Sequence, residues 1–184
     1  NVLMGTKGMI RSCISPSAQV AKCVRVTYDT TVLFDDMSNG GGIACDIENA
    51  LRMNADCMAV QTFIGTPGES RSLELLCRTA DAGTRYGIPT LGVVAVGKQM
   101  ERTEKFFQLA TRVLAENGAN VVKSYFCEGF ERVAAACPVP IVIAGGKKLP
   151  ELDALEMAYQ AIDQGAHGVD MGRNIFQSDC PAGM

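Results

Sequence analysis

Seven short runs rich in valine, isoleucine and methionine recur along the chain, each about as long as a strand. They cover residues 1–5, 23–28, 57–64, 88–97, 120–125, 140–145 and 168–172. Apolar residues continue through each run instead of alternating strictly with polar ones. This pattern predicts strands that are buried on both faces, as in a parallel sheet.

The segments between these runs carry apolar residues at helical spacing. Two segments show the i, i+3, i+4, i+7 pattern of a helix with one buried face: Leu73, Leu76, Cys77 and Ala80 in the first, and Phe106, Leu109, Ala110, Val113 and Leu114 in the second. Gly118 and Gly165 stand where a glycine ends a helix. Strands and helices therefore alternate, with about 20 to 35 residues from one strand to the next, the size of a βα unit.

A parallel sheet with helices on its faces is either an open doubly wound sheet or a (β/α)8 TIM barrel. Two features favour the barrel. No G-x-G-x-x-G turn follows the first strand, and the last two runs each end in glycine followed by a basic residue, Gly145-Gly146-Lys147 and Gly172-Arg173. Barrels often bind phosphate between the loops after strands seven and eight, beside a short extra helix that residues 174–177 can form.

Counting back from those two strands makes residues 1–5 the second strand of a barrel. We therefore expect residues 1–184 to be one TIM-barrel domain that lacks its first βα unit and its last helix.

Charge and hydropathy narrow the functional classes. The formal net charge is −3 and lysine and arginine are scattered, which argues against a nucleic-acid partner. No apolar run approaches the roughly 20 residues of a membrane-spanning helix, so we expect no membrane partner and a cytoplasmic location. The eight cysteines show no C-x-x-C pair and are expected to be reduced. With one histidine in the chain, we expect no metal.

Lys123 is the first candidate for chemistry. Period-2 alternation in its strand places Val121, Lys123 and Tyr125 on one face. If that face is the barrel interior, desolvation favours an uncharged amine that can attack a carbonyl and form a Schiff base. The alternative is a lysine that reaches solvent from the strand end or pairs with a carboxylate.

The glycines at the ends of the last two strands are candidates for anion binding. Gly145, Gly146 and Gly172 let backbone N–H groups approach a phosphate, and Arg173 or Lys147 adds charge. The alternative is a pair of tight strand-to-helix turns without a ligand.

Four further residues receive weaker assignments. His167 precedes the last strand and is expected to be structural, and Cys127 is expected to pack. Lys7 and Arg11 either add charge to the mouth of the barrel or lie in a solvated loop.

Several stretches together resemble the DeoC/FbaB class I aldolase family. They are VKSY at 122–125, GFER at 129–132, CPVPIVIAGGKKLP at 137–150 and QGAHGVDMGRNIFQSD at 164–179. The resemblance implies a (β/α)8 barrel, a homo-oligomeric ring, a Schiff-base lysine at Lys123 and phosphate binding by Gly145, Gly146, Gly172 and Arg173.

Within that family, the likeness is strongest to thiolase members that process a phosphorylated form of autoinducer-2. It implies a phosphorylated dione as substrate, no permanently bound cofactor, and coenzyme A as a co-substrate that receives an acetyl group. The products would be dihydroxyacetone phosphate and acetyl-CoA.

One position departs from the aldolases of the family that act on sugar phosphates. Those enzymes carry a proton-donating tyrosine where this chain has Ala95. The resemblance therefore favours the thiolase over the alternative of a class I aldolase or transaldolase-like synthase acting on a phosphorylated ketose such as fructose 1,6-bisphosphate. A second alternative is a non-catalytic ring-forming scaffold or phosphometabolite sensor.

Overall fold

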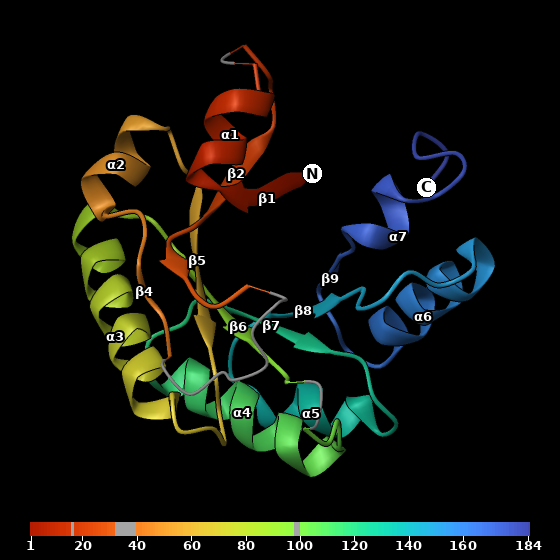
Figure 1. The fold of residues 1–184 in the computed structure, drawn as a ribbon. Coiled ribbons are helices and arrows are strands. Elements are labelled where there is room, and N and C mark those ends of the chain that lie inside the picture. The colour runs from red at the N-terminus through yellow and green to blue at the C-terminus, as the bar shows by residue number, and fades with distance from the viewer. Residues whose placement is uncertain (16, 32–39, 98–99) are drawn as a thin grey trace.

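The structure is a computed structural model that describes residues 1–15, 17–31, 40–97 and 100–184. Seven strands in this part of the chain form one parallel sheet with the order β1-β2-β5-β6-β7-β8-β9 (Figure 1). Their bounds are Val2–Thr6 (β1), Ala21–Arg25 (β2), Cys57–Thr62 (β5), Thr90–Val94 (β6), Val121–Tyr125 (β7), Ile141–Ala144 (β8) and Gly168–Asp170 (β9). Each predicted run coincides with or overlaps one of these strands.

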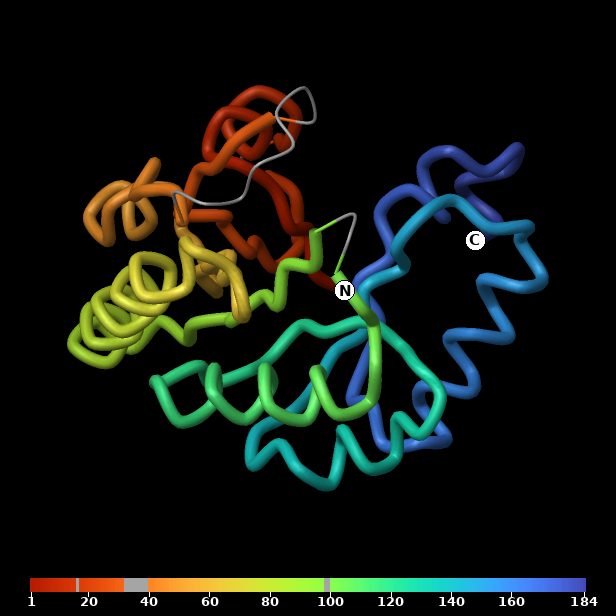
Figure 2. Tube along the Cα trace, turned by 60° about the horizontal axis from the view of Figure 1, so that its bottom comes forward, coloured from red at the N-terminus to blue at the C-terminus, as the bar shows by residue number. Residues whose placement is uncertain are grey.

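Helices follow the strands and cover the outer side of the curled sheet (Figure 1). They are α1 (Lys7–Cys13), α2 (Ile47–Arg52), α3 (Glu69–Tyr86), α4 (Glu104–Glu116), α5 (Phe130–Ala136), α6 (Glu151–Asp163) and α7 (Arg173–Phe176). The short helix predicted over residues 174–177 corresponds to α7, which begins and ends one residue earlier. The sheet curls so that both of its end strands, β1 and β9, contribute to one cavity (Figure 2). The predicted TIM-barrel architecture is therefore confirmed.

Local sequence signals fix the helix ends. Thr103 caps α4, since its side chain accepts a hydrogen bond from the Phe106 N–H. Gly118 and Gly165 follow the last residues of α4 and α6 with φ of +99° and +102°, a backbone conformation that favours glycine. Both glycines predicted to end helices do so.

Two apolar clusters lie on opposite sides of the sheet. The larger one packs the outer face of the strands against the helices and includes Leu76, Phe107 and Val122. The smaller one fills the inside of the barrel and consists of Cys23, Ala59 and Leu91 with Cys57, Val93, Val121 and Val142 packed against them. Strand β7 contributes alternate residues to the two sides, as its period-2 pattern predicts.

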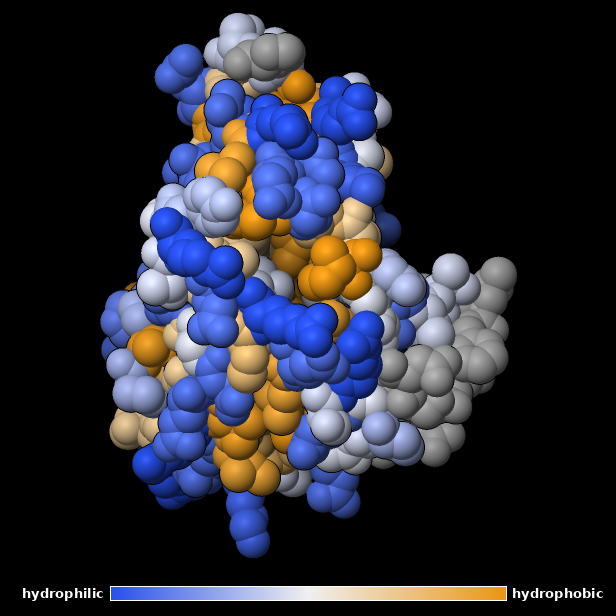
Figure 3. Space-filling view, turned by 90° about the vertical axis from the view of Figure 1, so that its left-hand side faces the viewer, coloured by the Kyte–Doolittle hydropathy of each residue, from blue (hydrophilic) through white to orange (hydrophobic). Residues whose placement is uncertain are grey.

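The surface that α2 and α3 present is largely polar. Hydrophilic side chains cover much of the face that carries α2 and α3, with apolar ones between them (Figure 3). On α3, Glu74 forms exposed ion pairs with Arg71 and Arg78. Such pairs contribute about 0–1 kcal/mol each, so the stability of this helix comes mainly from its buried face.

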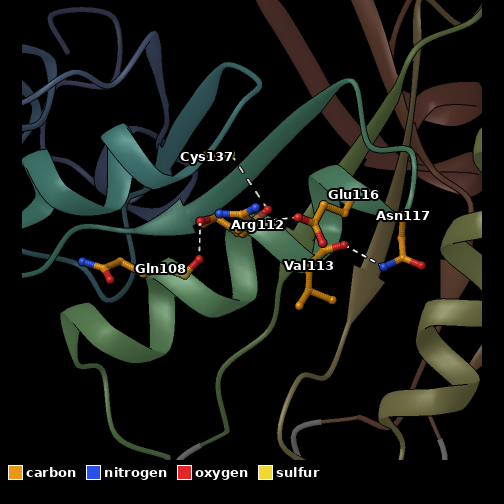
Figure 4. A network of polar contacts seen from close by, with 7 residues as sticks. Gln108, Arg112, Val113, Glu116, Asn117 and Cys137 are labelled. Atoms are coloured by element: carbon orange, nitrogen blue, oxygen red, sulfur yellow. Dashed lines mark hydrogen bonds and ion pairs between the residues drawn. The ribbon is translucent and has the colours of Figure 1, made fainter.

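Polar contacts lie along the C-terminal half of α4 and connect this helix to the residue that follows α5 (Figure 4). Arg112 Nε lies 2.8 Å from Glu116 Oε1, and Asn117 Nδ2 donates to the Val113 carbonyl at 2.8 Å. The Cys137 thiol, just after α5, donates to the Thr111 carbonyl at 3.9 Å. None of the helices in the described part of the chain is long and apolar enough to cross a membrane.

The run predicted over residues 23–28 is divided in two. After β2 ends at Arg25, β3 (Thr27–Tyr28) pairs antiparallel with β4 (Gly42–Ile43) as a small second sheet. The Gln61 N–H of β5 donates to the Thr27 hydroxyl at 3.1 Å. In a continued parallel pairing of the two strands, this N–H would donate to a main-chain carbonyl instead. Apolar periodicity does not reveal this switch from main-chain to side-chain pairing.

Candidate active site

A cavity of about 300 Å³ opens at the C-terminal ends of the barrel strands, where TIM-barrel enzymes carry their active sites. Its walls come from β1, β2, β5, β6, β7, β8, β9 and α7. They consist of Met4, Arg25, Ala59, Gln61, Val93, Val94, Lys123, Tyr125, Ala144, Gly145, Gly146, Asp170, Gly172, Arg173 and Phe176. All the predicted site residues, Lys123, Gly145, Gly146, Gly172 and Arg173, therefore line one cavity.

Lys123 lies in the middle of β7 and points into the barrel. Its neighbours Val122 and Ser124 are fully buried on the other face, against the helices. The lysine side chain is 12% exposed, and its Nζ lies 2.7 Å from Asp170 Oδ2. Lys123 therefore faces the barrel interior, as one interpretation of the sequence predicts, and is also paired with a carboxylate, as the alternative predicts.

Asp170 is a site residue that sequence reasoning missed. It is the last residue of β9, and on the strand register it lies beside Ala144 of β8, which in turn lies beside Tyr125. Its side chain is 29% exposed, so the carboxylate reaches both Lys123 and the cavity. Position 170 lies two residues before Gly172, and strand alternation alone would have placed both on the face toward the lumen.

The two glycine turns differ in how they present their backbone. Gly146 has φ of +67°, and a Cβ built there would meet nothing within 4 Å, so the turn borders open space. The N–H groups of Gly146 and Gly172 have no acceptor among the described residues. The Gly145 N–H, in contrast, donates to the Asp170 carbonyl at 3.3 Å, so the unpaired donor of this turn is the Gly146 N–H.

Asn174 joins the two turns to each other. This α7 side chain is 2% exposed, and its Nδ2 donates to the Gly145 carbonyl at 2.9 Å. Its Oδ1 accepts a hydrogen bond from the Leu149 N–H at 2.8 Å. The loop after β8 is thereby fixed against the loop after β9. The sequence places Asn174 in the short helix, but nothing in the pattern shows that its amide bridges both loops.

The tyrosine on the cavity wall comes from β7 and not from the position of Ala95 after β6. Ala95 is buried and does not line the cavity, whereas Val93 and Val94 form the β6 wall. The Tyr125 ring packs 6.2 Å from the Phe107 ring, and the Arg102 guanidinium stands 4.5 Å from the Tyr125 ring centroid. Tyr125 thus lines the cavity that also holds Lys123, while its ring packs against the outer cluster.

The weaker sequence candidates lie outside this cavity. His167 is exposed before β9, at the opposite end of the barrel, and its N–H donates to the Ile141 carbonyl. Cys127 packs against the outer core. Burial raises the pKa of its thiol, and the negative charges of Glu104 and Glu131 raise it further. Lys7 and Arg11 line a separate hollow between α1 and α2, and Lys7 Nζ donates to the Ala44 carbonyl. They do not contribute to the walls of the cavity.

The cysteines are all free thiols, and only Cys13 and Cys180 are exposed. In the described ranges, no group of three or more histidine, cysteine, aspartate and glutamate side chains lies close enough together to hold a metal ion. The residues on the cavity wall carry an amine, a carboxylate, a phenol, the Gln61 carboxamide, two guanidiniums and unpaired backbone N–H donors. This set can hold an anion and carry out carbonyl chemistry at an amine.

Comparison with known proteins agrees with this chemistry. Residues 6–178 match the family model of the DeoC/LacD family aldolases. The chain is 53% identical over 185 aligned residues to the 3-hydroxy-5-phosphonooxypentane-2,4-dione thiolase of Yersinia enterocolitica, and 51% identical to an uncharacterized aldolase of Pasteurella multocida. All of this chain aligns with each of them, and it spans 63% of their length.

Solved structures show the same fold. A Schiff-base-forming fructose-1,6-bisphosphate aldolase superposes with a TM-score of 0.88 at 21% sequence identity, covering 97% of this chain and 74% of that one. An archaeal fructose 1,6-bisphosphate aldolase superposes with a TM-score of 0.87 at 22% identity, covering 97% of this chain and 73% of that one. The barrel, the cavity at the C-terminal ends of its strands and the family match agree, and the chain belongs to the DeoC/LacD family of aldolases.

Proposed function

We propose that this protein is a thiolase that cleaves 3-hydroxy-5-phosphonooxypentane-2,4-dione through a Schiff base on Lys123 and passes the acetyl group to coenzyme A. The observation that carries the proposal is the placement of Lys123 and both glycine turns on the walls of one cavity. The names of the Yersinia relatives supply the substrate.

Substrate binding begins at the phosphate. The free N–H groups of Gly146 and Gly172 are donors for phosphate oxygens, and the Arg173 guanidinium adds charge-assisted hydrogen bonds. A phosphate held there fixes one end of a five-carbon chain. The carbonyl next to the phosphate-bearing carbon then lies toward Lys123.

Schiff-base formation needs an uncharged amine. Asp170, at 2.7 Å, is placed to accept the proton from the Lys123 ammonium as the nitrogen attacks the carbonyl carbon. Asp170 returns this proton to the carbinolamine oxygen, which leaves as water, so that an iminium ion bonded to Lys123 and a carboxylate at Asp170 remain. The carboxylate that held the ammonium remains beside the iminium and stabilises its charge.

Carbon–carbon cleavage follows at the second carbonyl of the dione. The coenzyme A thiolate, after its thiol has lost a proton to solvent, adds to that carbonyl carbon, and the carbonyl electron pair moves to oxygen. When the carbonyl re-forms, the bond to the hydroxyl-bearing carbon breaks, and its electrons enter the iminium to give an enamine. Protonation of the enamine and hydrolysis release dihydroxyacetone phosphate and regenerate Lys123, while acetyl-CoA leaves.

A class I aldolase acting on a phosphorylated ketose is the second candidate. Tyr125 favours it, because a phenol in the cavity is a potential proton donor for aldol cleavage. Ala95 favours the thiolase, because the aldolases of the family that act on sugar phosphates carry a proton-donating tyrosine at this position.

Product analysis separates the two activities. Protein incubated with the dione and coenzyme A is expected to form acetyl-CoA and dihydroxyacetone phosphate in equal amounts, with little cleavage of fructose 1,6-bisphosphate. Cleavage of the bisphosphate without acetyl-CoA formation from the dione would assign the aldolase activity instead.

We also propose a homo-oligomeric ring in the cytoplasm as the working form, on the family resemblance. Analytical ultracentrifugation tests the assembly, and a monomer at micromolar concentration would contradict it.

A further inference from the structure

Arg25 lines the cavity but has no role in the steps proposed above. It is the last residue of β2, and its side chain lines the cavity that contains Lys123. Its Nε is buried and has no hydrogen-bond acceptor in the part of the chain that the structure describes. Buried donors without a partner are rare in folded proteins, which points to an acceptor that arrives with a ligand.

The guanidinium remains charged in this position. Burial lowers the pKa of Arg25 and the charge of Asp29 opposes this effect, but an arginine side chain starts from so high a pKa that it does not lose its proton near neutrality. A charged planar donor in a partly desolvated wall favours an oxygen atom that carries or develops negative charge.

The position of Arg25 relative to the phosphate turns indicates which oxygen it meets. Four strands, β5, β6, β7 and β8, separate β2 from β9 in the sheet. Because the sheet curls, residues of β2, the strand next to the end strand β1, and of β9, the strand at the other end, nevertheless line the same cavity (Figure 2). Lys123 on β7 lies between them in strand order. If phosphate is held at β8 and β9 and the substrate is bonded to Lys123, the strand order places β2 beyond Lys123, on the side available to the far end of the substrate.

We propose that Arg25 donates hydrogen bonds to the oxygen of the acetyl carbonyl that coenzyme A attacks, an inference that rests on the proposed thiolase function. The thiolate forms the C–S bond while the carbonyl electron pair moves onto this oxygen. The bond to the hydroxyl-bearing carbon breaks when that pair returns. Arg25 stabilises the oxyanion between these two events, and it is regenerated unchanged.

Arg25→Gln tests the role, because glutamine keeps a donor but loses the charge and the planar fork. We expect kcat for acetyl-CoA formation to fall by about 100-fold. KM for the dione should stay within about twofold of wild type, because the oxyanion forms only after coenzyme A has attacked and is absent from the bound substrate. Arg25→Lys restores the charge and is expected to recover part of kcat. Arg85→Gln, at an exposed position in the last turn of α3, is the matched control and keeps wild-type kcat.

A second readout excludes a merely structural effect. Dihydroxyacetone phosphate contains the phosphate and the ketone but no acetyl group, so its trapping on Lys123 by borohydride is expected to be the same in wild type and Arg25→Gln. Loss of trapping in both Arg25→Gln and Arg25→Lys would show that Arg25 maintains the site rather than binding the oxyanion, and would overturn the proposal.

Two further outcomes also overturn it. An Arg25→Gln enzyme with wild-type kcat and a raised KM would show that Arg25 binds an anion of the ground state, such as a second phosphate. An Arg25→Gln enzyme with wild-type kcat and KM would show that the residue has no role. In each case the wild-type protein turns over the dione, so the proposed function stands. A wild-type protein that forms no acetyl-CoA would instead contradict the proposed function itself.

Discussion

Lys123 Nζ on β7 lies 2.7 Å from Asp170 Oδ2 on β9, across the intervening strand β8. The pair connects the residue proposed to bond the substrate with the strand whose end carries Gly172 and Arg173. An amine that attacks a carbonyl must first lose a proton, and Asp170 is the partner in position to accept it.

Asp170→Asn is therefore expected to slow imine formation. Asparagine keeps the shape of the side chain but is a poor proton acceptor, so kcat is expected to fall by roughly 100-fold or more. Rapid-quench borohydride trapping with dihydroxyacetone phosphate measures the imine step directly. Inorganic phosphate is expected to inhibit variant and wild type equally, because the backbone of position 170 is unchanged. Imine formation at more than about a third of the wild-type rate would rule out Asp170 as the proton acceptor.

Arg173→Ala is expected to weaken phosphate binding. The side chain is exposed at the start of α7 and borders the cavity, so its removal should leave the fold intact. Phosphate contacts are present in the ground state and in the transition state alike, so KM for the dione should rise about tenfold with little change in kcat. Steady-state kinetics distinguishes this result from a loss of kcat at constant KM, which would make Arg173 a catalytic group.

Asn174→Leu is expected to loosen both turns. The substitution leaves the Leu149 N–H and the Gly145 carbonyl without their buried partner, at about 1–3 kcal/mol for each unsatisfied group. Urea unfolding should therefore show a lower free energy of unfolding, and phosphate inhibition should weaken. Gln177→Ala, an exposed residue just after the same helix, provides the comparison. Equal stability of these two variants would show that the Asn174 amide does not hold the turns.

The sequence was most informative where one periodicity governs a whole element. Apolar continuity located all the strands of the parallel sheet, and the positions of Gly118 and Gly165 located two helix ends, because burial and backbone conformation are properties of single elements. Lys123 was identifiable for the same reason, as a charged residue on an inward strand face.

Residues that act through partners on other strands were not identifiable in this way. Asp170 has its role because its side chain reaches Lys123 across the intervening strand β8, and Asn174 has its role because α7 contacts the loop after β8. Arg25 was counted as part of an apolar strand, and only the curled sheet shows that its buried Nε lacks a partner. Such roles depend on how the sheet curls, which residue spacing along one chain does not determine.

Thiol reactivity is expected to follow burial. Burial raises the pKa of the Cys45 and Cys137 thiols above their ordinary value, so a smaller fraction is thiolate at pH 8. Iodoacetamide followed by peptide mass spectrometry should label the exposed Cys13 and Cys180 first. Preferential labelling of Cys45 or Cys137 at pH 8 would contradict this assignment.

The same shifts predict the direction in which stability changes with pH. Because these thiols have a higher pKa in the folded than in the unfolded state, their contribution to stability is complete below the unfolded-state pKa. It is lost as the pH rises from there through the folded-state pKa, so the free energy of unfolding in urea should be lower at pH 10 than at pH 8.

Borohydride trapping shows whether Lys123 forms a Schiff base with the substrate. Wild-type protein reduced in the presence of dihydroxyacetone phosphate should carry a permanent mass increase on the peptide that contains Lys123. Lys123→Arg should show neither the adduct nor turnover, because a guanidinium keeps the positive charge but stays protonated and cannot form the imine. An unmodified Lys123 peptide in an enzyme that turns over the dione, or a Lys123→Arg variant that keeps more than about a tenth of wild-type kcat, a barrier change below about 1.4 kcal/mol, would contradict the Schiff-base mechanism.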